Sequence, residues 1–203
     1  MTRVLLAWLG SYLIGSIPTG YWLVKWIKRV DVRTLGSGNV GATNVTRVAG
    51  GGLGKVVFVL DAAKGMIAAL LIAPMAGPTT EPTLALGCGL LAVVGHMFPV
   101  FLHFQGGKGV ATTIGVLLAT LPGMAAVCGA VWLVCFLLGR YVSAASVAAA
   151  AALPVAQLAA RQRPIDILLG GALAALIIMR HRANIQRLLA GTEHRAGRAH
   201  HSD

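Results

Sequence analysis

Long apolar segments separated by short polar ones dominate the pattern of hydrophobic and polar positions along the chain. A membrane-spanning helix takes about 20 residues, and most of these segments approach that length. The segments lie at residues 4–24, 54–74, 84–104, 110–121, 123–139, 142–159 and 165–180. The pattern predicts an all-α, polytopic membrane protein with about seven transmembrane helices.

The fourth and fifth segments decide the number of helices. Only Leu121, Pro122 and Gly123 separate them, and together they run for about 30 residues, against about 20 for one ordinary span. Proline followed by glycine favours a tight reversal of the chain, which gives seven spans. The alternative is a single long, kinked helix, which would give six spans and invert the predicted side of everything after it.

Composition excludes two broad classes of protein. Of the 203 residues, 57% are hydrophobic and 11% are charged, whereas a soluble domain averages about 45–50% and about 25%. So few charged residues cannot cover a soluble globular surface. Disorder is excluded as well, because disordered chains have low hydrophobicity.

The charges indicate the orientation in the membrane. Lys and Arg number 17 against 6 Asp and Glu, for a net charge of +11. On a soluble protein this excess would suggest nucleic acid, but here we expect none, since positive residues concentrate in cytoplasmic loops. Seven spans with the N-terminus outside and the C-terminus inside put 13 basic residues in cytoplasmic segments and three outside. An anionic substrate is the second explanation of the excess.

The chain is expected to form one integral membrane domain over residues 1–193, followed by a polar, disordered cytoplasmic tail over 194–203. The apolar run at the N-terminus is too long for a signal-peptide core, so we interpret it as a retained first span. Cys88, Cys128 and Cys135 lie in apolar segments and form no CxxC pair. No metal or redox framework is therefore predicted.

The first polar motif runs from Gly36 to Arg47. Its GxGxxG spacing is typical of dinucleotide sites, but those need a preceding strand, and membrane helices flank this motif. Glycines instead free consecutive N–H groups to form an anion-binding concavity. The alternative is an ordinary turn-rich loop with helix caps. The candidate binding residues are Ser37, Gly38, Asn39, Thr43, Asn44 and Arg47.

The second motif runs from Gly95 to Gly109. It resembles a P-loop, but a glycine follows Lys108 where Ser or Thr would be needed, so an NTPase is not expected. Glycines that open a helix, together with one lysine, still form a phosphate cradle. The candidates are His96, Gly106, Gly107, Lys108 and Gly109. His96 could alternatively be a packing residue inside the span.

Further polar residues stand near the C-terminus and inside the second span. His181 and Asn184 would share one face of a helix, although a basic amphipathic tail on anionic lipid is the alternative for this segment. Basic neighbours favour a neutral His181 that donates a hydrogen bond to phosphate. Asp61 and Lys64 are either functional groups within the membrane or a mutual structural pair.

All three motifs fall on the predicted cytoplasmic face, and all are rich in anion donors. They indicate a phosphorylated substrate that is reached from the cytoplasm and carries an apolar tail in the bilayer. A small transporter for an anion or phosphate ester is the alternative, but it would need polar residues in both membrane halves. A purely structural membrane subunit would leave the phosphate donors unexplained.

The three motifs resemble those of the PlsY family, the acyl-phosphate-dependent glycerol-3-phosphate acyltransferases of bacterial inner membranes. The resemblance rests on SGNVGATNV at 37–45, GHMFPVFLHFQGGKGVAT at 95–112 and HRANIQRLLAGTE at 181–193, and it covers about residues 2–193. Two positions depart from the family pattern: Val40 replaces a common proline and Gln105 a common lysine.

The resemblance implies transfer of a fatty acyl group from acyl phosphate to the 1-hydroxyl of glycerol 3-phosphate, which gives lysophosphatidic acid and phosphate. It implies a multi-pass protein of the inner membrane with a cytoplasm-facing site, no cofactor, and contact with membrane lipid and the enzyme that produces acyl phosphate. By resemblance Ser37, Lys108, His181 and Asn184 act in catalysis. The other candidates bind substrate, although Asn39, Thr43 and Asn44 are expected chiefly to shape the first loop. The His-x4-Asp motif of thioester-dependent acyltransferases is absent.

Overall fold

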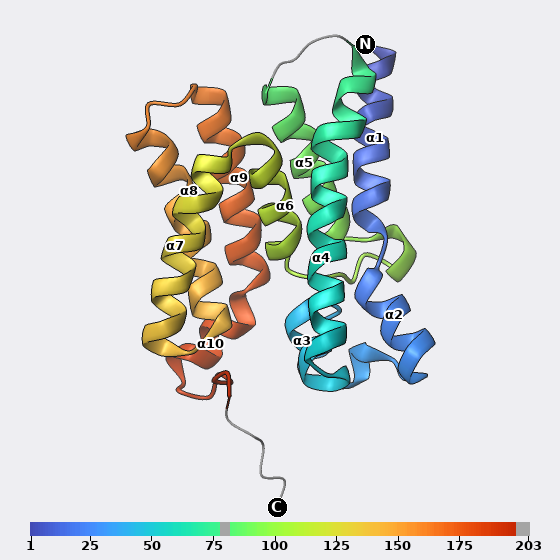
Figure 1. Cartoon of the computed structure of the whole chain (residues 1–203), viewed down its shortest axis with the longest axis vertical. Helices are drawn as coiled ribbons and strands as arrows, with labels where there is room; N and C mark the ends of the chain where they lie inside the picture. Colours follow the sequence, from blue (N-terminus) through green and yellow to red (C-terminus); the bar gives the residue numbers. More distant parts are fainter. Residues whose placement is uncertain (78–81, 198–203) are drawn as a thin grey trace, which may run out of the picture. The chain divides into compact units, whose positions relative to one another are not determined.

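The computed structural model describes residues 1–77 and 82–197, and within these ranges all regular structure is helical. The chain forms two compact units, Met1–Pro122 and Gly123–Asp203, whose helices are labelled in Figure 1. The α-helices are α1 Thr2–Ser16, α2 Thr19–Lys28, α3 Ala42–Ala49, α4 Gly51–Ile67, α5 Pro82–Met97, α6 Val110–Thr120, α7 Pro122–Gly139, α8 Val142–Ala159, α9 Pro164–Arg180 and α10 Arg182–Leu189. The all-α prediction is confirmed.

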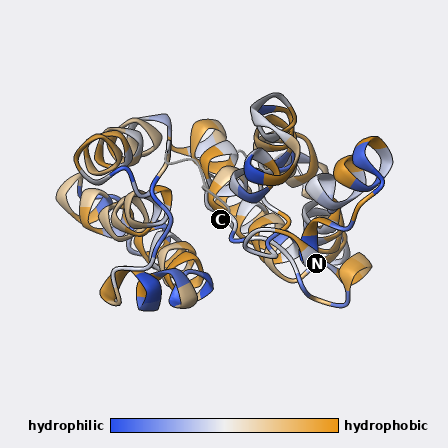
Figure 2. Ribbon diagram, turned by 90° about the horizontal axis from the view of Figure 1, so that it is seen from below, coloured by the Kyte–Doolittle hydropathy of each residue, from blue (hydrophilic) through white to orange (hydrophobic). Residues whose placement is uncertain are grey.

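Five stretches of the described residues are long and apolar enough to cross a membrane: Thr2–Lys28, Gly51–Ala76, Thr83–Leu102, Pro122–Gly139 and Val142–Ala159. A sixth arises only if α9 and α10, which are bent by 59°, form one span. The segment at 110–121 forms the separate helix α6, which has only 11 residues. Figure 2 shows hydrophobic residues over most of the helical ribbon.

The first apolar segment is broken, contrary to the prediction of one helix over 4–24. Proline disfavours helical dihedrals in the residue before it, and Ile17 has φ −59° and ψ 114° in front of Pro18. The chain therefore leaves α1 and begins α2 at Thr19. The break exposes a main-chain carbonyl at Ile17, which accepts a hydrogen bond from Lys64 Nζ at 3.1 Å.

Glycines bring the helices of the first unit into close contact. Gly15 of α1 meets the backbone of α5, and Gly95 of α5 meets the backbone of α1. Gly65 and Gly115 join α4 and α6 in the same reciprocal way. Small residues at helix contacts let backbones approach closely in lipid, where no hydrophobic effect drives helices together. These contacts fix α5 and α6, the two helices that flank the second motif.

In the second unit α8 packs on α9, and no residue of α7 is buried. Gln157 of α8 lies against Gly170 of α9, and its amide donates to the carbonyl of Asp166 at 3.0 Å. The tail that the sequence predicts to be disordered begins with contacts: Arg195 Nε donates to the Tyr141 hydroxyl at 2.8 Å. Residues 198–203 of that tail lie outside the described residues.

Candidate active site

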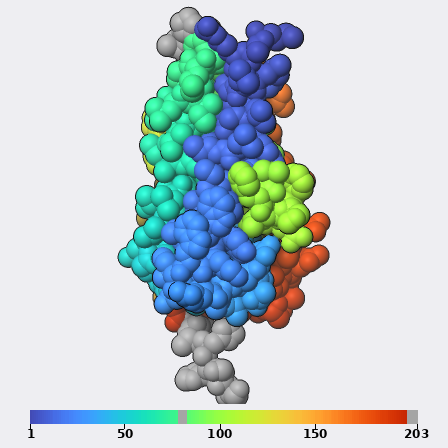
Figure 3. Space-filling view, turned by 90° about the vertical axis from the view of Figure 1, so that its right-hand side faces the viewer, coloured from blue at the N-terminus to red at the C-terminus, as the bar shows by residue number. Residues whose placement is uncertain are grey.

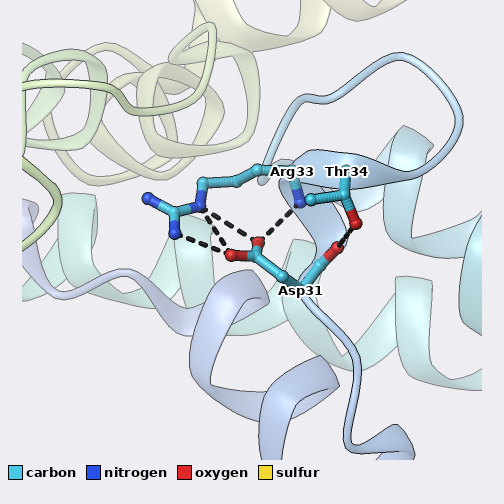
Figure 4. A network of polar contacts seen from close by, with 3 residues as sticks. All are labelled: Asp31, Arg33 and Thr34. Carbon is cyan, nitrogen blue, oxygen red and sulfur yellow. Dashed lines mark hydrogen bonds and ion pairs between the residues drawn. The ribbon is translucent and has the colours of Figure 1, made fainter.

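A bidentate ion pair shapes the segment that leads into the first motif (Figure 4). The Arg33 guanidinium lies 2.7 Å from one oxygen of Asp31, and the Arg33 main-chain N–H donates to the other at 2.9 Å. The Thr34 hydroxyl donates to the Asp31 carbonyl at 2.9 Å. The hydrogen bond from the Arg33 side chain holds the pKa of Asp31 below its usual value. The turn that presents the first motif is therefore tightly closed.

Asn44 determines the conformation of the first motif. Its side chain is 1% exposed, its Oδ1 accepts from the Ser37 N–H at 2.8 Å, and its Nδ2 donates to the carbonyls of Val32 and Leu35 at 3.2 and 3.1 Å. Such side-chain bonds to the main chain replace the hydrogen bonds that a loop otherwise lacks. This geometry supports the loop-shaping role expected for Asn44.

The remaining polar residues of the first motif divide into a structural and an exposed group. Asn39 Oδ1 accepts from the Gly41 N–H at 2.8 Å, which tightens the turn before α3. Ser37, Thr43 and Arg47 are exposed on the same loop and helix. The exposed group supplies two hydroxyls and one guanidinium, which are suitable donors for a phosphate.

The second motif is a loop that is pinned to the end of α5. The Gly106 N–H donates to the Met97 carbonyl at 3.2 Å, and the Gly107 N–H donates to the His96 carbonyl at 3.0 Å. A Cβ at Gly107 would overlap the His96 imidazole, so this position requires glycine. The helix predicted to reach residue 104 ends at Met97, since Pro99 follows and cannot continue it.

Lys108 stands between two fixed glycines. Gly107 precedes it, and Gly109, with φ +80°, directly precedes the first turn of α6. The lysine is half-buried. The unpaired N–H groups at the start of a helix carry a partial positive charge, and a cation beside them strengthens the attraction for an anion. The phosphate cradle stays a prediction, and the lysine lies at the helix start where that prediction needs a cation.

The first and second motifs meet in one hydrophobic cluster of the first unit. Its buried members come from α2, α4, both motifs and the 3-10 turn Val32–Thr34 before the first motif: Val24, Val32, Val40, Val45, Val57 and Leu102. The ring centroids of Trp22 and Phe101 lie 6.2 Å apart, and Figure 3 shows the light-green second motif directly beside the blue segment of α2. Two motifs that are about 60 residues apart in the sequence are therefore neighbours in space.

The third motif belongs to the second unit, where His181 precedes α10 and Asn184 lies in its first turn. His181 Nδ1 lies 2.8 Å from the Ile177 carbonyl oxygen. A carbonyl oxygen only accepts, so Nδ1 carries the proton, and Nε2 of the neutral ring has none. The predicted hydrogen bond from His181 to phosphate would need a proton on Nε2, and it stays a prediction.

Glu193 is the structural residue that the sequence reasoning missed. Its Oε1 accepts from Asn184 Nδ2 at 2.7 Å and from the Ser143 hydroxyl at 2.8 Å, and its Oε2 lies 2.7 Å from Arg187 Nε. Burial favours a higher pKa for Glu193, but these hydrogen bonds hold the pKa below its usual value. The carboxylate connects α8 to α10 and orients the Asn184 amide. The signal in the sequence was that Glu193 is an acidic residue in a segment that is otherwise basic.

The described residues contain no group of three His, Cys, Asp or Glu side chains that could hold a metal ion. Cys88, Cys128 and Cys135 are free thiols.

Comparisons with known proteins identify relatives over nearly the whole chain. The family model described as glycerol-3-phosphate acyltransferase matches residues 5–191. Glycerol-3-phosphate acyltransferases of Myxococcus xanthus and Gloeobacter violaceus are 47% and 45% identical, over 91% and 94% of this chain and 95% and 93% of theirs. A crystal structure of PlsY (YgiH), an integral membrane glycerol 3-phosphate acyltransferase in its glycerol 3-phosphate form, is 45% identical with a TM-score of 0.89, and the match covers 96% of each chain.

Proposed function

The chain belongs to the glycerol-3-phosphate acyltransferase family and is an acyltransferase of lipid biosynthesis, and we propose that it takes its acyl group from acyl phosphate. The observation that carries this donor is the loop 106–109, which presents one lysine at the start of α6 between fixed glycines. Such a cradle suits the phosphate of a mixed anhydride, whereas a thioester has no phosphate at its reacting end. The transporter alternative has no support from the comparisons.

The proposed mechanism relies on positioning. Acyl phosphate is already activated, so the protein holds two anions close together and stabilises the charge that develops. Lys108 with Gly106, Gly107 and Gly109 would hold the acyl phosphate. The other proposed phosphate contacts are Ser37, Thr43, Arg47, His181 and Asn184, while Gly38, Asn39, Asn44 and His96 support the loops. The products would be lysophosphatidic acid and inorganic phosphate.

The donor is tested with the purified chain in detergent or in lipid nanodiscs. Glycerol 3-phosphate is supplied with palmitoyl phosphate in one reaction and palmitoyl-CoA in another, and lysophosphatidic acid is measured in both. Phosphate release is followed in the first reaction and CoA release in the second. We expect product only with palmitoyl phosphate, with one phosphate released per acyl transfer. Product formed with palmitoyl-CoA alone would contradict the proposal.

His181 is expected to bind substrate and not to act as an indispensable base. His181→Ala should raise the KM for glycerol 3-phosphate more than it lowers kcat, which marks lost ground-state binding. The departing phosphate is itself basic and lies next to the attacking hydroxyl, so it takes the proton. Steady-state kinetics over a range of pH check this. A kcat lowered about 10³-fold at unchanged KM and recovered at high pH would identify His181 as the base.

We also propose seven spans in the bacterial inner membrane, with the N-terminus outside and the site facing the cytoplasm. The charge asymmetry supports this orientation, as does the separation of α6 from α7 at Leu121. A single acyltransferase domain over residues 1–193 would then stand beside the acyl-phosphate-producing enzyme at the cytoplasmic surface. A reporter that is active only in the cytoplasm should therefore be active when it is fused after Arg195, and a reporter that is active only in the periplasm should be inactive there. Activity of the periplasmic reporter at this position would contradict a cytoplasmic C-terminus.

A further inference from the structure

One carboxylate oxygen lies at the junction of three helices in the first unit. Oδ1 of Asp61, in the middle of α4, accepts a hydrogen bond from the Thr19 hydroxyl at 2.6 Å. The same oxygen lies 2.9 Å from Lys64 Nζ and 3.5 Å from His96 Nδ1. Asp61 is 1% exposed and Lys64 4%. Buried charges are stable only when paired and hydrogen-bonded, so this cluster is held together as a unit.

Two of these contacts lead directly to the motifs. Thr19 is the first residue of α2, and the next residue, Gly20, lies so close to the Val40 carbonyl of the first motif that a Cβ would overlap it. His96 holds the loop 106–109 of its own motif: its carbonyl accepts from the Gly107 N–H at 3.0 Å, and its imidazole fills the space where a Gly107 side chain would lie.

The third contact of Asp61, with Lys64, stabilises the bend between α1 and α2. Lys64 Nζ donates to the Ile17 carbonyl at 3.1 Å while it pairs with Asp61. The ammonium thus ties the bend in the chain to α4. Without the carboxylate, the buried ammonium would lack its counter-charge, and the start of α2 would lose the bond from Thr19.

We infer that Asp61 is a positioning residue of the acyl-transfer reaction. It touches no substrate and acts through two neighbours. Thr19 fixes the position of the first motif relative to α2, and His96 fixes the position of the loop 106–109 relative to α5. The inference rests on the proposed role of these two motifs in binding the substrate phosphates. Misplacing a catalytic group by about 1 Å can lower a rate about 10²-fold. A small displacement of the two loops should therefore change the measured kinetics.

The test compares Asp61→Asn with the double variant Asp61→Asn/Lys64→Met in lipid nanodiscs. The double variant removes the unpaired ammonium and so separates positioning from charge balance. Asp166→Asn is the matched control, because Asp166 is also buried and pairs with Arg163 in the second unit at 2.8 Å. The KM for each substrate, kcat and the thermal unfolding temperature are measured for all variants, with the acyl donor that the wild-type chain uses.

We expect Asp61→Asn to raise the KM for glycerol 3-phosphate and for the acyl donor about tenfold. The double variant should regain thermal stability but keep the raised KM, and Asp166→Asn should keep the wild-type KM. A merely structural loss reduces the number of active molecules, which lowers apparent kcat at constant KM. An unchanged KM in Asp61→Asn, or a wild-type KM in the double variant, would overturn the inference.

Thr19 gives a second, milder test. Thr19→Val keeps the shape of the side chain and removes the hydroxyl, whereas Thr19→Ser keeps the hydroxyl. Thr19→Val should raise both KM values and Thr19→Ser should leave them near wild type. Equal KM values in the two variants would contradict the role of this hydrogen bond. A wild-type chain that rejects acyl phosphate would refute the proposed donor alone, since the KM for glycerol 3-phosphate still tests Asp61.

Discussion

Lys108→Ala should lower kcat/KM about 10²–10³-fold, the range expected when one fixed electrostatic donor is removed from a dry site. The lysine lies between Gly107 and Gly109 at the start of α6, and in the proposed mechanism its ammonium would stabilise the phosphate that gains negative charge as it leaves the acyl group. Lys108→Arg should also be poor, because a planar guanidinium does not reproduce a compact ammonium between glycines. Phosphate release from palmitoyl phosphate measures the effect.

Lys55→Ala is the matched control, since Lys55 is exposed on α4 and belongs to none of the motifs. It should retain wild-type kinetics. Near wild-type turnover in Lys108→Ala would mean that the phosphate cradle lies elsewhere in the chain.

Gly107→Ala should lower kcat/KM about 10²-fold by displacing the loop that carries Lys108. The added methyl group would overlap the His96 imidazole, and the Gly107 N–H is already committed to the His96 carbonyl at 3.0 Å. Either the ring or the loop must therefore move. Steady-state kinetics for both substrates, together with thermal unfolding, measure the outcome.

Gly87→Ala, on the same helix as His96, is the control, because nothing lies within 4 Å of a Cβ at that position. It should retain wild-type activity. If the clash is the cause, Gly107→Ala and His96→Ala should be strongly non-additive, since the smaller side chain makes room for the methyl group. Additive losses would show that Gly107 acts in another way.

The apolar pattern predicted the helices better than their ends. Six of the seven segments correspond to long helices or bent helix pairs, because a run of about 20 apolar residues has few alternatives in a membrane. The errors occur at prolines: Pro18 divides the first segment, and Pro99 ends α5 at Met97. In both places the missing N–H and the restricted residue before proline outweigh the hydrophobic pattern.

The parts of the candidate site that are formed by neighbouring residues in the sequence could be predicted. The parts that are formed by contacts between distant residues could not. The glycines and Lys108 of the second motif could be recognised from spacing alone. The contacts of Asp61 with Thr19 and His96 join residues 42 and 35 positions apart in the sequence, and only folding brings them together. The tautomer of His181 likewise depends on the Ile177 carbonyl, which carries no sequence signal.

The glycine contacts between α1 and α5, and between α4 and α6, also determine which positions of this sequence can be substituted during evolution. A methyl group at Gly15 or Gly115 would meet main-chain atoms of the facing helix, and those cannot move aside without parting the pair. No residue of α7 is buried, by contrast, so we expect its exposed positions to tolerate other apolar side chains. Adaptation to bilayers of different thickness or lipid content should therefore change the outer faces of the helices and leave their contact lines constant, so that one loop geometry can serve many membranes.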